Sequence, residues 1–369
     1  MKIVHMISGG ETGGSRKHVV TLLSKLPKED VCLIVFQEGP LAEEARQVGV
    51  RVELFKQKSR YDLSILSRLV SFINKEKFDI LHTHGPRANF YGTFIKKKLS
   101  ALWVTTIHSD PKLDFMKSGV KGWLFTKLNL ASIRKIDYFF AVSDRFKSNL
   151  MEFGIPEEKI QSVYNGIDFS PAIDSQKELR KQLQLTNEVF VLTMVARLHP
   201  VKGHEMVFKA LKQLHNPKIK LLLVGDGPIR TDLEEKVKEM GLNSQVSFLG
   251  FRKDVNAIFS FSDAALLASF SESFPLVLLE AANENVPIIT TDVGGVNELI
   301  TSPEKGWVVP VGDEGEFANA IESAYKDWEI GKLRDKGVNL RQFAQEHFSL
   351  DKLASLTWDT YARLLKRKN

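Results

Sequence analysis

Residues 188–211 carry the sequence EVFVLTMVARLHPVKGHEMVFKAL, in which three patterns follow one another. Residues 188–196 are an apolar run rich in valine, which is typical of a buried strand. Residues 197–203 contain Pro, Gly and basic side chains, as loops do. Helical spacing then follows, with apolar side chains at Met206, Val207, Ala210 and Leu211. A buried strand, a short loop and an amphipathic helix form the repeating unit of a doubly wound α/β fold.

The same alternation extends along the chain in both directions. The second half has apolar runs at 188–196, 218–224, 246–249, 264–268, 287–291 and 306–310. The first half has six more, at 2–8, 31–36, 51–55, 79–84, 103–109 and 138–143. Because segments with helical spacing separate these runs, each half is predicted to be a parallel sheet covered by helices.

The length of 369 residues exceeds the roughly 250–300 residues at which a single hydrophobic core stops growing. Residues 168–187 interrupt the alternation with polar residues and are predicted to link two lobes. We expect an N-terminal lobe over 1–170, a C-terminal lobe over 188–348, and a C-terminal helix over 349–369 that can cross back to the first lobe. Ligands of such folds bind at the carboxyl ends of the strands, which would here face a cleft between the lobes.

The composition is that of a soluble globular protein, with 43% hydrophobic and 26% charged residues. A single cysteine, Cys32, excludes a disulfide scaffold and a cysteine-rich zinc site. The apolar stretch before Ser8 is too short for a signal peptide or a membrane span, so we expect a cytoplasmic protein.

The net charge of +6 is unevenly distributed along the chain. Residues 1–170 contain 26 Lys and Arg against 18 Asp and Glu, whereas residues 171–369 contain 25 against 27. This surplus in the first half indicates either an anionic partner or a solvated basic surface. Residues 96–127 carry much of it, because basic residues alternate there with aromatic ones from Lys96 to Lys127, as in segments that dock on anionic membranes. No nucleic-acid-binding signature accompanies the charge.

A glycine-rich loop follows the first predicted strand, with glycines at positions 9, 10, 13 and 14. Glycines between a strand and a helix let backbone amides approach a ligand, and the helix N-terminus favours negative charge. The spacing is not that of a dinucleotide-binding fingerprint. We expect Gly13 and Gly14 to contact a ligand; a tight turn is the alternative.

Two basic residues occupy the corresponding loop of the second lobe. Arg197 offers a planar guanidinium and Lys202 a point charge, and both suit a pyrophosphate group. A pair of solvated surface cations is the alternative.

A third candidate segment, residues 271–282, reads SESFPLVLLEAA. Pro275 suits the first turn of a helix, whose free amides at Leu276 and Val277 would point toward a ligand. Glu280 lies on an otherwise apolar helix, so its carboxylate needs donors such as sugar hydroxyls or a structural ion pair. Glu272 and Glu280 could also serve as a general acid and base.

We expect no metal site. The sequence contains no Asp-x-Asp motif. The segment His82-Thr83-His84 is interpreted as placing its two imidazole rings on opposite faces of a strand, with His84 toward the cleft and His82 structural.

These motifs, in this order, resemble those of family-4 glycosyltransferases, which are retaining enzymes of the GT-B fold that use nucleotide sugars. The second half contributes Arg197 with Lys202, Glu272 with Glu280, and the segments 224–228 and 291–298. The first half contributes the glycine-rich loop and the segments 106–108, 141–143 and 165–168. Residues 283–285, Asn-Glu-Asn, depart from the small-residue segment that is common in the family.

The resemblance implies a role for each candidate residue. Arg197 and Lys202 would hold the donor diphosphate, and Glu280 would bind the ribose hydroxyls. Glu272 and the backbone at Phe274, Pro275 and Leu276 would face the transferred sugar and the phosphate. His108 would reach a sugar hydroxyl near the reacting carbon, unless it is a histidine that caps a strand end.

We therefore expect the transfer of a hexosyl unit from a nucleoside-diphosphate sugar, with UDP preferred, to a lipid-linked or saccharide acceptor in cell-envelope or exopolysaccharide assembly. No cofactor or essential metal is expected, and the basic first lobe would contact the inner face of the cell membrane. The alternatives are a nucleotide-sugar epimerase of the same fold and a catalytically silent partner subunit.

Overall fold

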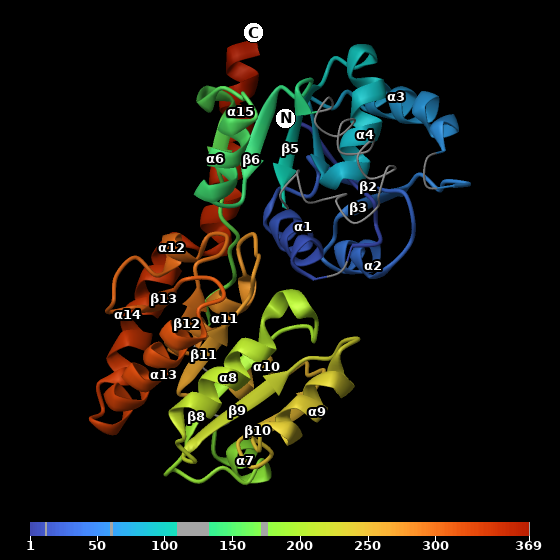
Figure 1. Cartoon of the computed structure of the whole chain (residues 1–369). Helices are drawn as coiled ribbons and strands as arrows, with labels where there is room; N and C mark the ends of the chain where they lie inside the picture. The colour runs from blue at the N-terminus through green and yellow to red at the C-terminus, as the bar shows by residue number, and fades with distance from the viewer. Residues whose placement is uncertain (12, 60–61, 109–132, 171–175, 369) are drawn as a thin grey trace. The chain divides into compact units, whose positions relative to one another are not determined.

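The computed structural model describes the chain except residues 12, 60–61, 109–132, 171–175 and 369 (Figure 1). The chain divides into two compact units: unit 1 comprises Met1–Gly166 and Leu350–Asn369, and unit 2 comprises Ile167–Ser349. Each unit contains one parallel sheet covered by helices, so the predicted α/β architecture is confirmed.

Unit 1 is built on seven parallel strands in the order β3-β2-β1-β4-β5-β6-β7. They are β1 (Ile3–Ile7), β2 (Val31–Val35), β3 (Arg51–Leu54), β4 (Ile80–His84), β5 (Leu102–Ile107), β6 (Tyr138–Ala141) and β7 (Ile160–Ser162). Six of them correspond to predicted runs. The seventh, β7, has three residues, two of them polar, and is too short and too polar for the pattern to indicate a strand.

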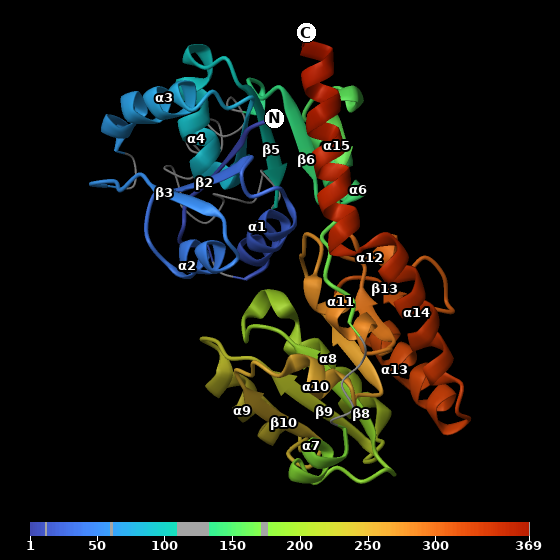
Figure 2. The same ribbon diagram turned by 180° about the vertical axis from the view of Figure 1, so that it is seen from behind.

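Within its described residues, unit 1 has the helices α1 (Gly14–Lys25), α2 (Pro40–Gln47), α3 (Leu66–Lys75), α4 (Gly85–Ile95), α6 (Asp144–Glu152) and α15 (Leu350–Lys368). One hydrophobic core joins one face of the sheet to α1, α2 and α15. The last helix, α15, lies beside β6 and α6 in both views (Figures 1 and 2), and its Tyr361 is fully buried. The end of the chain therefore completes the first unit.

Unit 2 has six parallel strands in the order β10-β9-β8-β11-β12-β13, all of them predicted. They are β8 (Phe190–Val195), β9 (Ile219–Val224), β10 (Val246–Gly250), β11 (Ala264–Leu267), β12 (Ile288–Thr291) and β13 (Gly306–Val309). The helices are α7 (Gln176–Gln182), α8 (His204–Leu214), α9 (Arg230–Glu239), α10 (Val255–Phe259), α11 (Leu276–Asn283), α12 (Val296–Leu299), α13 (Glu314–Glu329) and α14 (Leu333–His347). Helices α8, α9 and α13 pack on one face of the sheet, and α7 and α10 on the other.

Residues 168–187, which we expected to form a linker, fall within unit 2. Leu179 and Leu183 in and beside α7 pack against the core under α10. The Arg180 guanidinium donates to the backbone carbonyls of Phe261, Thr186 and Val189. Because residues 168–187 are mostly polar, their sequence did not indicate the short amphipathic helix α7, which is part of the second unit.

Among the residues described, no helix combines the length and the apolar character needed to cross a membrane.

Candidate functional site

The loops at the carboxyl ends of four strands of unit 2 are tied together by backbone hydrogen bonds. The Leu198 amide, after β8, donates to the Asp226 carbonyl after β9 at 3.0 Å. The Phe270 amide, after β11, donates to the Val201 carbonyl at 2.8 Å, and the Gly295 amide, after β12, donates to the Ser273 carbonyl at 2.9 Å. The four motif segments of the second half, which contain Arg197 with Lys202, residues 224–228, Glu272 and residues 291–298, therefore meet at one edge of the sheet.

Two glycines make this close approach possible. Gly203 has φ +70°, and a Cβ atom there would lie 2.0 Å from the Ala268 carbonyl oxygen. Gly294 has φ +53°, and its Cβ would lie 2.2 Å from the Ser273 carbonyl oxygen. Only glycine meets both the conformational and the steric demand at these positions.

Lys202 and Glu272, predicted separately, form an ion pair. Oε1 of Glu272 also accepts a 2.6 Å hydrogen bond from the Ser269 hydroxyl. The two side chains are only 22% and 13% exposed, so the pair is largely shielded from water. Arg197 is exposed and makes no ion pair within the described part of the chain. A phosphate group at this edge would meet one accessible cation and one cation already neutralised by Glu272.

The predicted helix after Pro275 is α11, and Pro275 is its N-cap residue. The amides of Leu276 and Val277 lie in the first turn, where amides lack intrahelical partners. Phe274 is buried, and its ring lies 5.1 Å from that of Phe348. Glu280 is half-buried on α11, as the apolar residues around it in the sequence led us to expect.

The glycine-rich loop of unit 1 splits into two pairs. A Cβ on Gly10 would lie 2.2 Å from Nε2 of Gln37, and one on Gly9 would lie 2.4 Å from the Gln37 carbonyl oxygen. Packing within the protein therefore explains that pair. Gly13, the N-cap of α1, and Gly14, its first residue, have no atom of the described residues within 4 Å of a built Cβ.

Five histidines gather in unit 1: His5 on β1, His18 on α1, His82 and His84 on β4, and His108 just after β5. We call them the histidine cluster. Four are fully buried, and His108 is half-buried. In the sheet register His5 lies opposite His82. The imidazole nitrogens of His84 and His108 approach to 3.1 Å, so His108 joins a buried polar group rather than standing alone at the strand end.

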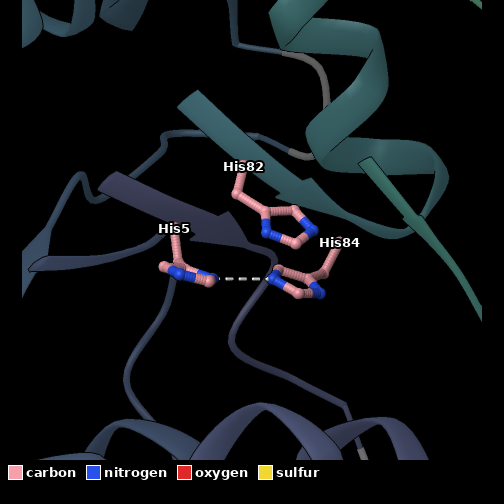
Figure 3. A group of neighbouring side chains, drawn as sticks. All are labelled: His5, His82 and His84. Atoms are coloured by element: carbon pink, nitrogen blue, oxygen red, sulfur yellow. Dashed lines mark hydrogen bonds between the residues drawn. The ribbon is translucent and has the colours of Figure 1, made fainter. Parts of the chain in front are cut away.

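The expectation that His82 and His84 lie on opposite faces of the strand is wrong. Their rings stack with centroids 4.4 Å apart and planes 20° from parallel, and Figure 3 shows both beside His5. The physical reason is simple, because residues two positions apart on a strand point to the same face.

Burial lowers the pKa of every imidazole in the histidine cluster. The pKa of His5 falls to about 3 and that of His18 to about 4, and those of His82, His84 and His108 fall well below the ordinary value of 6.5. All five are thus neutral near pH 7, which is also the form that binds metals. Two groups have nitrogens within 4.8 Å of one another: His5, His82 and His84, and His18, His84 and His108. Both ring nitrogens of His82 are already hydrogen-bonded, to the hydroxyls of Tyr361 and Thr106, and are therefore not available to a metal ion.

A polar cavity of about 740 Å³ lies in unit 1 beside the carboxyl ends of β1, β2 and β3. Its lining includes Ser8, Glu11, Gln37, Lys56, Gln57 and Arg87. The Arg87 guanidinium donates to the Ser8 hydroxyl at 2.9 Å, and the Glu11 carboxylate accepts the Gly9 amide at 2.7 Å. None of these residues was predicted from the sequence, although Gly85-Pro86-Arg87 directly after a predicted strand was a usable signal.

The predicted membrane-facing segment lies mostly outside the described residues, including Lys112, Lys117, Lys121 and Lys127. Lys96 is described, and its amine pairs with the Asp137 carboxylate. That lysine therefore has a structural partner within unit 1.

Two family models together match nearly the whole chain. The model described as Glycosyltransferase Family 4 matches residues 12–170, and the one described as Glycosyl transferases group 1 matches residues 175–343. The N-acetyl-alpha-D-glucosaminyl L-malate synthase of Bacillus anthracis is 31% identical over 319 residues, which cover 83% of this chain and 80% of the relative.

Two further comparisons extend over nearly the full length. The Escherichia coli UDP-Gal:alpha-D-GlcNAc-diphosphoundecaprenol alpha-1,3-galactosyltransferase is 26% identical and aligns over 100% of this chain and 98% of its own. The crystal structure of Anabaena Alr3699/HepE in complex with UDP superimposes with a TM-score of 0.87 at 22% identity, covering 98% of this chain and 100% of that one.

Proposed function

The chain belongs to glycosyltransferase family 4, and on that premise we propose that it moves a hexosyl unit from a UDP-sugar to an acceptor hydroxyl, with retention of configuration, in the assembly of a cell-envelope or extracellular polysaccharide. The family and the GT-B fold that the sequence motifs predicted are confirmed. The observation that carries the proposal is the convergence of Arg197, Lys202, Glu272 and the start of α11 at one edge of the unit 2 sheet.

The charges at this edge suit a donor diphosphate. Arg197 is exposed and can pair with one phosphate. Lys202 can exchange its bond to Glu272 for a second phosphate, which would release the carboxylate toward the sugar. UDP as the nucleotide is supported by the HepE complex and by the UDP-Gal donor in the name of the Escherichia coli relative.

The same groups can stabilise the leaving group. Cleavage of the sugar–phosphate bond builds negative charge on the departing UDP. Two cations and the amides of Leu276 and Val277 can neutralise it in place, and such preorganised donors lower the barrier. We propose on this ground that catalysis needs no cofactor, with Glu280 on α11 bound to the ribose hydroxyls.

Unit 1 is proposed to bind the acceptor. Its polar cavity offers hydroxyl, amide, carboxylate and guanidinium groups, as a saccharide or a phosphate-bearing lipid requires. No atom of the described residues lies near a Cβ built on Gly13 or Gly14, so an acceptor or donor group can approach their backbone. His108 is the imidazole proposed to contact a sugar hydroxyl.

The proposal is tested by thermal unfolding with a panel of UDP- and GDP-sugars. A ligand that binds the folded state raises Tm by mass action, so one or more UDP-sugars should raise it. The Arg197→Ala variant should lose this shift, whereas Lys209→Ala, which removes an exposed lysine of α8 that pairs with Glu314, should keep it. No shift with any nucleotide sugar would favour a catalytically silent partner. Interconversion of the UDP-sugar without an acceptor would favour an epimerase.

A further inference from the structure

Three members of the histidine cluster form a hydrogen-bonded row, which we call the histidine chain: His5, His84 and His108. Nδ1 of His5 lies 3.0 Å from Nε2 of His84, and Nδ1 of His84 lies 3.1 Å from Nε2 of His108. The ring centroids are 5.3 and 5.4 Å apart, with planes only 14° and 29° from parallel. Figure 3 shows the first link, with the two rings meeting edge to edge. These are N–H···N hydrogen bonds between imidazoles.

The histidine chain must run in one direction. A neutral imidazole has one donor and one acceptor nitrogen, so all three rings carry their proton either on Nδ1 or on Nε2. Nε2 of His5 is buried and has no hydrogen-bond partner in the described part of the chain. A proton there would be a buried donor without an acceptor, which folded proteins rarely contain. The geometry therefore favours protons on Nδ1, with His5 donating to His84 and His84 donating to His108.

The other two members of the histidine cluster, His82 and His18, contact rings of the histidine chain but are not part of it. His82 stacks on His84, but its nitrogens are bonded to Tyr361 and Thr106. Nδ1 of His18 donates to Oδ1 of Asn165 at 2.7 Å, and the His18 ring meets that of His108 edge-on at 4.8 Å. Among the described residues, the titratable groups packed against the three rings are thus His18 from α1, His82 from β4 and Tyr361 from α15.

We propose that the histidine chain fixes His108 as the neutral Nδ1–H tautomer, so that His108 meets the substrate as a hydrogen-bond donor while its Nε2 accepts from His84. His5 and His84 are then positioning residues for the proposed transfer reaction. The assignment of the tautomer stands on the geometry of unit 1, whereas the role toward a sugar rests on the proposed function.

A metal bound by His18, His84 and His108 is the competing arrangement. It would need the facing nitrogens of His84 and His108 both unprotonated, and it would replace the 3.1 Å hydrogen bond between them. The two arrangements differ in the proton on Nδ1 of His84, which can be observed directly.

The decisive measurement is two-bond ¹H–¹⁵N NMR of the full chain labelled with ¹⁵N-histidine, because it reports the tautomer and charge of each ring. We expect His5, His84 and His108 to be neutral with the proton on Nδ1 from pH 8 to pH 6. In His84→Gln, the His108 signal should change tautomer or begin to titrate in this range. Tyr361→Phe is the matched control, since it removes a partner of His82 outside the histidine chain and should leave the three signals unchanged.

The same NMR spectra can also contradict the proposed tautomer. A charged His108, an Nε2–H tautomer of His108, or a His108 signal unaffected by His84→Gln would overturn the proposal. Zinc that copurifies with the protein and shifts the His18, His84 and His108 signals together on removal would establish the metal arrangement instead.

An activity measurement separates this proposal from the proposed function. His84→Gln and His5→Gln should each lower kcat of transfer by at least about tenfold, as losing an oriented donor does, with KM for the UDP-sugar unchanged. Tyr361→Phe should change kcat much less. If the tautomers shift in the variants but kcat does not, the positioning role is wrong. If Arg197→Ala leaves transfer intact, the proposed function fails while the tautomer assignment stands.

Discussion

Among single residues, the pairing of Lys202 with Glu272 links the sequence motifs to chemistry most closely. In the protein without ligand, each of these largely shielded charges neutralises the other. In the proposed donor site a diphosphate would replace Glu272 as the partner of Lys202, so that donor binding would also release the carboxylate. The pair thus explains why a cation and an acid 70 residues apart in the sequence belong to one site.

Replacing Lys202 with alanine should weaken donor binding and also reduce stability. The variant lacks one phosphate contact and leaves Glu272 without its cation, which costs about 1–3 kcal/mol in a partly buried position. Calorimetric titration with UDP should show a Kd increased roughly tenfold or more, equivalent to about 1.4 kcal/mol or more. Lys209→Ala should match the wild type, and an unchanged Kd in Lys202→Ala would show that this lysine does not contact the diphosphate.

At the scale of the element, the strand–loop–helix unit from β8 to α8 requires a glycine where the loop meets β11. Backbone strain in Gly203→Ala should destabilise unit 2 by about 1–3 kcal/mol. The clash of the new Cβ atom with the Ala268 carbonyl should add to this loss. Gly241→Ala is the control, because Gly241 has φ +73° but no atom of the described residues within 4 Å of a built Cβ. Urea unfolding should therefore show a larger loss for position 203, and equal losses at both positions would contradict the tight approach of the two loops.

The elements also show what the sequence could and could not predict. Long apolar runs identified all six strands of unit 2, because buried parallel strands are apolar on both faces. The three-residue β7 and the polar helix α7 carry too little periodic signal. The convergence of the motif segments of unit 2 was predictable because these segments follow strand ends directly. The histidine chain was missed because it depends on sheet order: only the pairing of β1 with β4 brings His5 beside His82 and His84.

On the scale of the whole molecule, the two units should respond differently to acid. The pKa values of His5 and His18 in the folded state, about 3 and 4, lie below the ordinary 6.5, so the unfolded chain binds protons first as the pH falls. Their contribution to stability is complete above about pH 6.5 and is lost as the pH falls toward 3. Burial in unit 2 instead raises the pKa of Asp263 to about 6, which acts in the opposite direction.

Hydrogen exchange measured between pH 7 and pH 4.5 should therefore show unit 1 losing protection before unit 2. A pKa that is lower by one in the folded state than in the unfolded chain corresponds to about 1.4 kcal/mol. At pH 4.5 two such histidines therefore lower the free energy of unfolding of unit 1 by several kcal/mol. His18→Gln should flatten the acid dependence of unit 1. Equal loss of protection in both units, or an acid dependence unchanged in His18→Gln, would contradict this assignment.

The charge distribution over the whole chain leads to a prediction about membrane binding. A variant in which Lys112, Lys117, Lys121 and Lys127 are replaced by glutamine should bind anionic vesicles more weakly, by roughly 1 kcal/mol for each lysine near the surface. Lys96→Gln should have little effect, since that amine pairs with Asp137. Cosedimentation with vesicles that contain anionic phospholipid, compared with vesicles of neutral phospholipid, measures both. Unchanged binding by the fourfold variant would assign the basic surplus to solvated surface.

The most direct test of the whole account is the release of UDP from a UDP-sugar in the presence of a saccharide or lipid-linked acceptor, followed with wild type, Arg197→Ala and Lys209→Ala. We predict transfer by the wild type and by Lys209→Ala, a product that retains the anomeric configuration of the donor, and a loss of roughly 100-fold or more in Arg197→Ala. Transfer at the wild-type rate by Arg197→Ala would contradict the claim that this edge of unit 2 binds and activates the donor.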